Sequence, residues 1–402
     1  MLKVLELFAG IGACSKALER LGIEHEIVDA VEIDKYAIAS FNAIHGTNFE
    51  PQDITKWDKD IGCDLIMHGS PCQDFSVAGK QAGGDKDSGT RSSLMYETLR
   101  IVEKLKPKYV IWENVKNLLS KKHRHNFDAY LEAMEKLGYK NYYQVLNAKH
   151  YGVPQNRERV FTVSIRLDVP YCWAFEFPPK QPLTKRLKDV LESEVDEKYY
   201  LSDDRLDVIY KWEQRQKENS RGFRFEVKDG DSIGRAVTTS GDRPCSTNYV
   251  AESYYTEGSI KRIKNNILNS DITNTLTANG MQSFNHNNCT LIKTANKQGY
   301  DMATDGDGVD LAYPDSTTRR GRVGHGVAKT LPTSDSQGVL DGYRIRKLTP
   351  KECWRLMGFD DTDFEKAEKV NSNTQLYKQA GNSIVVNVLG AILKELLDGS
   401  AD

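Results

Sequence analysis

Short apolar runs alternate with amphipathic segments over the first 170 residues of the chain. The runs have the length of strands, and the segments between them carry apolar residues at helical spacing. This alternation is typical of an α/β fold, in which parallel strands are joined by right-handed crossovers. The predicted strands span residues 4–8, 26–33, 64–67, 109–112, 142–147 and 160–165.

Four helices are predicted between these strands. The first follows Gly12, places Ala17 and Leu18 on one apolar face, and stops at Gly22. The other three are expected at residues 36–41, 94–105 and 127–137. Each would cover the sheet with its apolar face.

The pattern changes near Phe175. Prolines at 178, 179 and 182 interrupt any regular element, as a domain boundary does. Beyond them we expect one helix at residues 202–216, capped by Ser202. The residues up to about Gly342 are rich in Ser, Thr, Asn, Asp and Gly, with short β-like pieces. A second domain is therefore expected at residues 176–345.

Regular patterning returns at Thr349. Thr349 and Glu352 form a capping box with Pro350 at the first helical position, so a helix should begin there and end near Gly358. The last segment, residues 383–397, is apolar around much of its circumference and must be buried. We expect it to pack back onto the first domain, which would then comprise residues 1–175 and 346–402.

The composition is that of a soluble globular protein, with 39% hydrophobic and 28% charged residues in a chain of 402. No run suggests a membrane span and no signal peptide precedes the first strand, so we expect a cytoplasmic monomer without a membrane partner. Seven scattered cysteines without CxxC spacing argue against a disulfide frame and against a metal site.

The net charge of −2 is not that of a strongly basic nucleic-acid-binding domain. Basic side chains nevertheless gather at residues 104–124, 261–264 and 319–322. Each cluster is a candidate phosphate-binding surface, and a solvated charged face is the alternative.

The segment FAGIG, residues 8–12, lies between a predicted strand and a predicted helix. Its glycines allow a ligand to approach the backbone, and the helix start offers N–H groups. Ser15 stands where a dinucleotide fingerprint has its third glycine, so a diphosphate cradle is only half supported. Glu32 could accept hydrogen bonds from ribose hydroxyls, and Asp53 could meet an adenine amino group. Together these residues predict an adenosine pocket.

The segment GSPCQDFS, residues 69–76, follows the short strand at residues 64–67. Pro71 fixes its own φ, so the thiol of Cys72 would be held on a stiff loop at a strand end. Open α/β sheets place their chemistry at such loops. The alternative is that Cys72 is a small buried hydrophobic residue.

Two further motifs lie beside predicted strands. Glu113 of ENV would meet the Cys72 loop over the sheet, where a carboxyl group can hydrogen-bond to a ring nitrogen or protonate it. Arg157 and Arg159 of QNRER point to one face of an extended segment, so one guanidinium can hold a base carbonyl and the other a phosphate or carboxylate. Residues 78–94, rich in glycine and charge, are predicted to form a mobile lid.

The ordered series FAGIG, GSPCQDFS, ENV, QNRER, RKLTPKECWRLMGF (residues 346–359) and GNSIVV (residues 381–386) resembles that of the DNA cytosine-5 methyltransferases of prokaryotic or phage restriction-modification type. The resemblance spans residues 4 to about 390. It implies an α/β, Rossmann-like S-adenosylmethionine-dependent methyltransferase sheet. It also implies an inserted, smaller and mostly β or irregular target-recognition domain.

The resemblance implies a role for each motif. Cys72 would add to carbon 6 of a flipped cytosine, and Glu113 would contact its N3 and amino group. Asn114 would be a positioning residue, Arg159 would donate to the cytosine carbonyl, and Arg157 would support the site. The pocket for S-adenosylmethionine, with S-adenosylhomocysteine as product, would be lined by Phe8, Ala9, Gly10, Ile11, Gly12, Glu32, Ile33, Asp53, Ile54, Pro71, Leu94, Asn382 and Ser383.

The implied partner is double-stranded DNA, and a cognate restriction endonuclease would act on the same sequence without forming a stable complex. Two positions depart from the family pattern. Ala78 replaces a frequent small hydroxyl residue on the lid, and Ile33 replaces a frequent aromatic residue that stacks on adenine. Candidate readers of base edges in the inserted domain are Arg243, Asn279, Gln282 and Gln337.

Three alternative readings are open at this point. The tRNA-methylating branch of the same family has a much smaller recognition region than this long insert. A nicotinamide dehydrogenase built on FAGIG is disfavoured by Ser15 and does not explain Cys72 and Glu113. A catalytically silent DNA-binding module is disfavoured because Cys72, Glu113 and Arg159 are all present.

Overall fold

The computed structural model describes residues 1–71, 91–200, 232–239, 248–253 and 343–398, and short strands between residues 227 and 339. Cys72, residues 78–90 of the predicted lid, the predicted helix at 202–216, Arg243 and Asn279 lie outside the described residues. The chain divides into two compact units. The first comprises Met1–Val195, Glu213–Asn248 and Leu348–Asp402, and the second comprises Asp196–Trp212 and Tyr249–Lys347.

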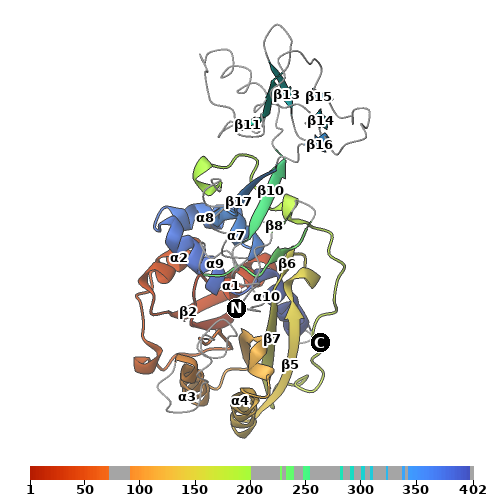
Figure 1. The fold of residues 1–402 in the computed structure, drawn as a ribbon. Coiled ribbons are helices and arrows are strands. Elements are labelled where there is room, and N and C mark those ends of the chain that lie inside the picture. The colour runs from red at the N-terminus through yellow and green to blue at the C-terminus, as the bar shows by residue number, and fades with distance from the viewer. Residues whose placement is uncertain are drawn as a thin grey trace. The chain divides into compact units, whose positions relative to one another are not determined.

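The main sheet of the first unit has six strands: β1 (Leu2–Leu7), β2 (His25–Val31), β3 (Leu65–His68), β4 (Tyr109–Val115), β5 (Tyr139–Asn147) and β7 (Glu158–Arg166). Their order is β2-β1-β3-β4-β7-β5. Figure 1 shows β2 on one side of this sheet and β7 and β5 on the other. The first four are parallel, as the alternation predicts. The expectation of an all-parallel sheet is wrong for β7, which runs antiparallel to β4 and β5. The connection at residues 148–157 is too short for a helical crossover, so the chain returns in the opposite direction.

Helices cover both faces of the sheet, because side chains alternate along each strand. On one face, Leu5, Ile66 and Trp112 pack against α3 (Met95–Leu105) and α4 (Arg124–Lys136). On the other face, Glu6 contacts Ser15 of α1 (Ala13–Arg20). Alternate residues of β1 therefore contact α1 on one face of the sheet and the core beneath α3 and α4 on the other.

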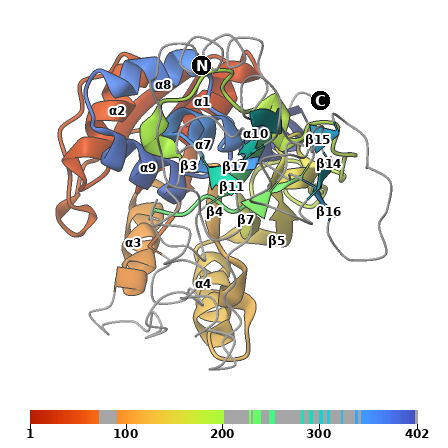
Figure 2. The ribbon, with the colours of Figure 1, turned by 45° about the horizontal axis from the view of Figure 1, so that its top comes forward.

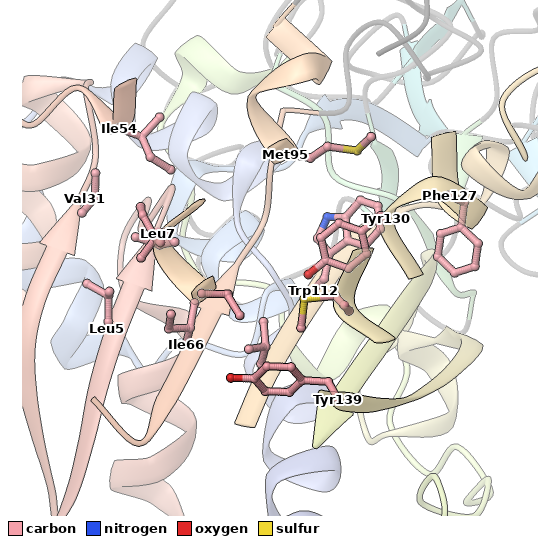
Figure 3. Close-up of a cluster of buried hydrophobic side chains, with 14 of the residues drawn as sticks. Leu5, Leu7, Val31, Ile54, Ile66, Met95, Trp112, Phe127, Tyr130 and Tyr139 are labelled. Atoms are coloured by element: carbon pink, nitrogen blue, oxygen red, sulfur yellow. The ribbon is translucent and has the colours of Figure 1, made fainter. Parts of the chain in front are cut away.

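The core beneath α3 and α4 is aromatic. The ring centroids of Trp112 and Tyr130 lie 4.2 Å apart, and those of Trp112 and Phe127 lie 5.8 Å apart (Figure 3). All three side chains are almost completely buried. Large buried rings contribute most of the packing energy of such a core, so the carboxyl end of β4 rests on a rigid base.

The C-terminal part of the first unit contains α7 (Pro350–Leu356), α8 (Asp361–Glu368), α9 (Asn373–Asn382) and α10 (Val386–Asp398). The predicted capping box is confirmed, since Glu352 N donates to Thr349 Oγ1 at 3.2 Å and Thr349 N donates to Glu352 Oε2 at 2.8 Å. α8 lies beside α2 (Lys35–His45) in both ribbon views (Figures 1 and 2). The carboxyl-terminal chain thus packs on helices from the amino-terminal half.

The predicted helix at residues 383–397 begins later than expected. Ser383 ends α9 with an extended backbone, and α10 starts only at Val386. Among the described residues, the stretch Asn373–Asp398 is long and apolar enough to span a membrane, judged by length and composition alone. The break at Ser383 divides this stretch in two, and α10 buries Val388, Leu389 and Ile392 while contacting α1. This is the pattern of a helix in a protein core.

The second unit contains short antiparallel strands. β10 (Tyr249–Ser253) pairs with β17 (Tyr343–Lys347). One small sheet has the order β11-β12-β13 (Met281–Ser283, Thr290–Lys293, Tyr300–Ala303), and another the order β15-β14-β16 (Val323–Gly324, Gly308–Asp310, Gln337–Val339). Gln282 is on β11 and Gln337 on β16.

The first unit also contains three two-residue strands: β6 (Gln155–Asn156), β8 (Val227–Lys228) and β9 (Gly234–Arg235). β6 and β9 pair in parallel. Single turns of 3-10 helix complete the described elements: η1 (Ile54–Lys56), η2 (Arg91–Leu94), η3 (Lys116–Leu119), η4 (Ala148–His150), η5 (Leu187–Asp189) and η6 (Glu197–Tyr199).

Candidate active site

Three neighbouring parallel strands reach the same level of the sheet, where β1 and β3 end and β4 continues to Val115. Leu7 of β1 is paired with His68 of β3, and His68 is paired with Trp112 of β4. The residues that follow in each chain segment, Phe8, Gly69 and Glu113, therefore come together at one edge. The FAGIG loop, the residues before Cys72 and the ENV motif meet there because their strands are parallel and adjacent. ENV lies within β4, which continues past the predicted strand end at residue 112 to Val115.

A cavity lies at this edge. Its lining combines the FAGIG loop, the strand end before Cys72, the ENV motif and the GNSIVV segment. The lining residues are Glu6, Leu7, Phe8, Ala9, Gly10, Ala13, Cys14, Met67, Gly69, Glu113, Asn382, Ser383 and Ile384.

The alternation of side chains divides the ENV motif between two tasks. Glu113 faces the cavity, as do Glu6 of β1 and Met67 of β3. Trp112 and Asn114 instead bond to Ser70, on the loop that leads to Cys72. One strand end thus contributes to the cavity wall and also holds the neighbouring loop.

The FAGIG loop has three residues with positive φ. Phe8 has φ +52°, which is uncommon for a residue other than glycine, and it lines the cavity. Gly10 has φ +57° and open space where a Cβ would stand. Gly12 has φ +80°, and a Cβ there would lie 2.1 Å from His45 Nε2. Gly10 therefore leaves the backbone open toward the cavity, whereas Gly12 makes room for His45.

Ser15 has a structural role at the place where a dinucleotide fingerprint has its third glycine. Ser15 N donates to Glu6 Oε1 at 3.0 Å, and Ser15 Oγ donates to the same oxygen. Burial raises the pKa of Glu6 to about 7, because a charged carboxylate is poorly solvated inside the protein, and the bonds from Ser15 oppose this effect. The buried Glu6 thereby ties the start of α1 to β1.

Glu32 joins the loops that follow β1 and β2. Its Oε2 accepts from Gly10 N at 3.0 Å, and its Oε1 accepts from Asp34 N at 2.9 Å. Burial raises the pKa of Glu32 against these hydrogen bonds. The neighbouring Ile33 is 71% exposed. Asp53 accepts through Oδ1 from the backbone N–H and the hydroxyl of Thr55, which lowers its pKa.

Glu113 and Arg159 form an ion pair across adjacent strands. Arg159 is paired with Val115 in the ladder, and its Nε lies 3.0 Å from Glu113 Oε1. The side chains of Glu113 and Arg159 are 11% and 21% exposed, so the pair is largely shielded from water. A carboxylate and a guanidinium side by side can contact the acceptor and donor edge of a base together.

Arg157 holds the loops behind this pair. Its Nη1 donates to Val237 O at 3.0 Å, and its Nη2 donates to Gly381 O at 3.2 Å and to Ser383 O at 2.9 Å. A Cβ on Gly381 would lie 2.4 Å from the backbone of Thr238, so only glycine fits there. The two arginines of QNRER thus have separate partners: Arg157 bonds to backbone carbonyls of distant segments, and Arg159 pairs with the carboxylate of Glu113 and donates to Glu158 O.

The structure gathers six of the predicted site residues around the cavity: Phe8, Ala9, Gly10, Glu113, Asn382 and Ser383. Ile11 and Ile54 are buried, and Ile54 packs in the hydrophobic core together with the partly buried Leu94. Pro71 is the last described residue before Cys72.

Several residues of the site were missed at the level of sequence. Gln155 donates to Leu356 O at 2.6 Å and accepts from Val237 N at 3.0 Å, so it holds two distant segments together. Ser70, His68 and Trp112 form a buried group next to the Cys72 loop. The alternation of side chains along β4 could have placed Trp112 on the face of the sheet next to Ser70. The contacts of Gln155 are with residues far away in the sequence, so no local pattern predicts them.

Comparisons with known proteins give the family. Residues 2–398 match the family model described as C-5 cytosine-specific DNA methylase. The chain is 35% identical to the orphan methyltransferase M.SPRI of Bacillus phage SPR, over 98% of this chain and 97% of that protein. It is 32% identical to the type II methyltransferase M2.ScrFI of Lactococcus lactis subsp. cremoris, over 98% of this chain and 99% of that protein.

Solved structures support the fold. The Entamoeba histolytica methyltransferase EhMeth is similar with a TM-score of 0.62 and 15% identity, covering 100% of this chain and 99% of that one. The S. pombe Dnmt2 methyltransferase has a TM-score of 0.58 and 19% identity, covering 100% of both chains. With a family match over nearly the whole length, this chain belongs to the C-5 cytosine-specific DNA methylases and is a DNA (cytosine-5)-methyltransferase.

Proposed function

We propose that the protein transfers a methyl group from S-adenosylmethionine to carbon 5 of a cytosine flipped out of duplex DNA, through a covalent bond between Cys72 and carbon 6. The observation that carries this proposal is the position of Glu113. Glu113 forms the ion pair with Arg159 and also lines the cavity beside Phe8 and Asn382. A group suited to binding a base and a pocket suited to a methyl donor therefore share one wall.

The residues around the cavity fit the proposed methyl donor. The open space at Gly10 allows a ligand to approach the backbone closely. Glu32 would accept hydrogen bonds from the ribose hydroxyls, and the exposed Ile33 offers an apolar surface to adenine. Asp53 would accept from the adenine amino group. When bound, S-adenosylmethionine supplies an electrophilic methyl group, and S-adenosylhomocysteine is the product.

The proposed nucleophile answers a chemical difficulty. Carbon 5 of cytosine is too electron-poor to attack a methyl group, but addition of a thiolate at carbon 6 makes carbon 5 nucleophilic. A free thiol with a pKa of about 8.5 is only about 3% ionised at pH 7, so the site must favour the addition step. Glu113, in its protonated form, would donate to N3, and Arg159 would donate to the carbonyl oxygen, where charge develops. Once carbon 5 has taken the methyl group, loss of the carbon 5 proton to a base, such as water, allows the thiol to leave.

The target base must leave the double helix before Cys72 can reach it, at a cost of about a few kcal/mol. We propose residues 1–175 and 346–402 as the catalytic domain and residues 176–345 as the domain that reads the sequence. Gln282 on β11 and Gln337 on β16 remain candidate readers of base edges. A cognate restriction endonuclease would share the recognition sequence.

The test uses the whole protein with tritiated S-adenosylmethionine and duplex DNA, and in parallel with tRNA. We expect label in DNA cytosine and a covalent adduct with duplex DNA that contains 5-fluorocytosine. Cys72→Ser should abolish the adduct. Label in tRNA but not in DNA would contradict the proposed substrate, and an adduct that survives Cys72→Ser would contradict the proposed nucleophile.

A further inference from the structure

Ser70 is held from the neighbouring strand. It lies two residues before Cys72 and is 3% exposed. Trp112 Nε1 donates to Ser70 Oγ at 3.0 Å, and Asn114 Nδ2 donates to Ser70 O at 3.3 Å. The next residue, Pro71, has a fixed φ, so little backbone freedom separates the held serine from the cysteine.

Trp112 is itself fixed by aromatic neighbours. Its ring stacks on the ring of His68, with a distance of 5.6 Å between centroids and an interplanar angle of 4°. The centroid of the Tyr130 ring lies 4.2 Å from that of Trp112, and Figure 3 shows these two side chains together. The indole N–H of Trp112 donates to the hydroxyl of Ser70. Because the ring cannot turn within this packing, the direction of the N–H bond is set by the core.

His68 links the two ends of the chain segment that contains Cys72. One ring nitrogen, Nε2, lies 2.9 Å from Tyr130 Oη, and the other, Nδ1, lies 3.4 Å from Thr98 Oγ1. Burial lowers the pKa of His68 to about 3, so the ring is neutral and can donate on one side and accept on the other. Residue 68 ends β3 before the segment and residue 98 lies on α3 after it, so this contact joins the two described elements.

We propose that Trp112 and Ser70 are positioning residues for the nucleophile, with the Trp112–Ser70 hydrogen bond fixing the strand end from which Cys72 extends. This inference rests on the proposed function, because it assumes that Cys72 attacks the base. The competing explanation is that the hydrogen bond contributes only to folding stability. A misplacement of about 1 Å can lower a reaction rate about 100-fold. A positioning role therefore predicts a slower reaction at unchanged binding affinity, whereas a purely structural role predicts a loss of stability alone.

The test compares three variants of the full-length protein. Trp112→Phe keeps a buried ring and removes the N–H, and Ser70→Ala removes the acceptor. The matched control is Tyr139→Phe, which removes a buried hydroxyl that donates to Pro107 O at 2.7 Å, before β4 begins. The readouts are the single-turnover rate of adduct formation with 5-fluorocytosine duplex DNA, the dissociation constants for DNA and S-adenosylhomocysteine, and urea unfolding.

We expect Trp112→Phe and Ser70→Ala each to slow adduct formation at least tenfold, with both dissociation constants within twofold of wild type. Tyr139→Phe should lose stability without this loss of rate. The double variant should be no slower than the slower single variant, because both remove one interaction. Ser70→Thr, which keeps the hydroxyl, should recover most of the rate.

Adduct rates in Trp112→Phe and Ser70→Ala that fall no further than in Tyr139→Phe would overturn the inference. If Trp112→Phe does not fold, Ser70→Ala and its recovery in Ser70→Thr decide the question. The proposed function fails separately, since wild-type protein that forms no adduct with 5-fluorocytosine DNA contradicts that function before any variant is compared.

Discussion

Arg157 Nη2 donates to the carbonyl of Ser383 at 2.9 Å and so joins two motifs that are 226 residues apart in the sequence. The same guanidinium also bonds to Val237 O and Gly381 O. It therefore holds the segment that brings Asn382 and Ser383 to the cavity. The arginine acts on the cavity through the backbone rather than through a charge directed into it.

Arg157→Lys should weaken binding of the methyl donor. A lysine ammonium cannot reproduce the fork geometry that serves three carbonyl groups. We expect about a tenfold weaker affinity for S-adenosylhomocysteine and a loss of about 2 kcal/mol in the free energy of unfolding, as for a buried network of hydrogen bonds. Calorimetric titration and urea unfolding measure both. Arg124→Lys, on the surface of α4, is the control, and equal effects in the two variants would argue against this role.

Glu113→Gln should remove most of the methyl transfer. The amide keeps the size of the side chain but cannot form the ion pair with Arg159, and it lacks the acidic proton that the carboxyl group, once protonated, would share with N3. Loss of one such group typically costs about 100-fold or more in rate. The initial rate of transfer to DNA tests this, with Glu132→Gln on α4 as control. A rate within threefold of wild type would contradict the role assigned to Glu113, because it corresponds to a change of only about 0.6 kcal/mol in the activation free energy.

The two glycines of FAGIG should fail in different ways when changed to alanine. Gly12→Ala places a Cβ 2.1 Å from His45 Nε2, so it should cost stability, about 2–4 kcal/mol with the strain of positive φ included. Gly10→Ala has open space, so it should cost only about 1 kcal/mol but weaken S-adenosylhomocysteine binding.

Urea unfolding and calorimetric titration separate the two effects. His45→Ala should recover part of the stability lost in Gly12→Ala, because it removes the atom that the new Cβ meets. If His45→Ala gives no recovery, the clash is not the reason for glycine at position 12.

Glu6→Gln should change how stability depends on pH. The pKa of Glu6 in the folded protein is about 7, above its reference value of 4.5, so the folded state holds this proton more tightly than the unfolded state. The protonated carboxyl therefore favours folding fully below pH 4.5, and this contribution is lost as the pH rises to about 7. A shift of this size corresponds to about 3 kcal/mol.

The glutamine variant can still accept from Ser15 but carries no charge. We expect it to be more stable than wild type at pH 8 and nearly equal to it at pH 4.5, as measured by urea unfolding. The control is Glu24→Gln at an exposed position, which should change little at either pH. A difference between Glu6→Gln and wild type that does not vary with pH would contradict the predicted titration.

The sequence by itself determined the elements and the motif loops. Strand and helix periodicity, the capping box at Thr349 and the glycines of FAGIG are local signals, since they depend on residues within a few positions of one another. Parallel strands then required the FAGIG loop and the ENV motif to lie at one edge of the sheet. The sequence therefore predicts which motifs contribute to the candidate active site.

Only the tertiary structure decided which side chains those loops bring together. The reversal of β7 depends on its neighbours in the sheet, and the apolar residues Ile384 and Val385 lie outside α10 although their pattern continues that of the helix. Glu6 with Ser15, Gly12 with His45 and Arg157 with Ser383 are contacts between different elements. Packing selects such partners by shape and by the requirement that buried polar groups be bonded, and neither condition is visible along a single chain.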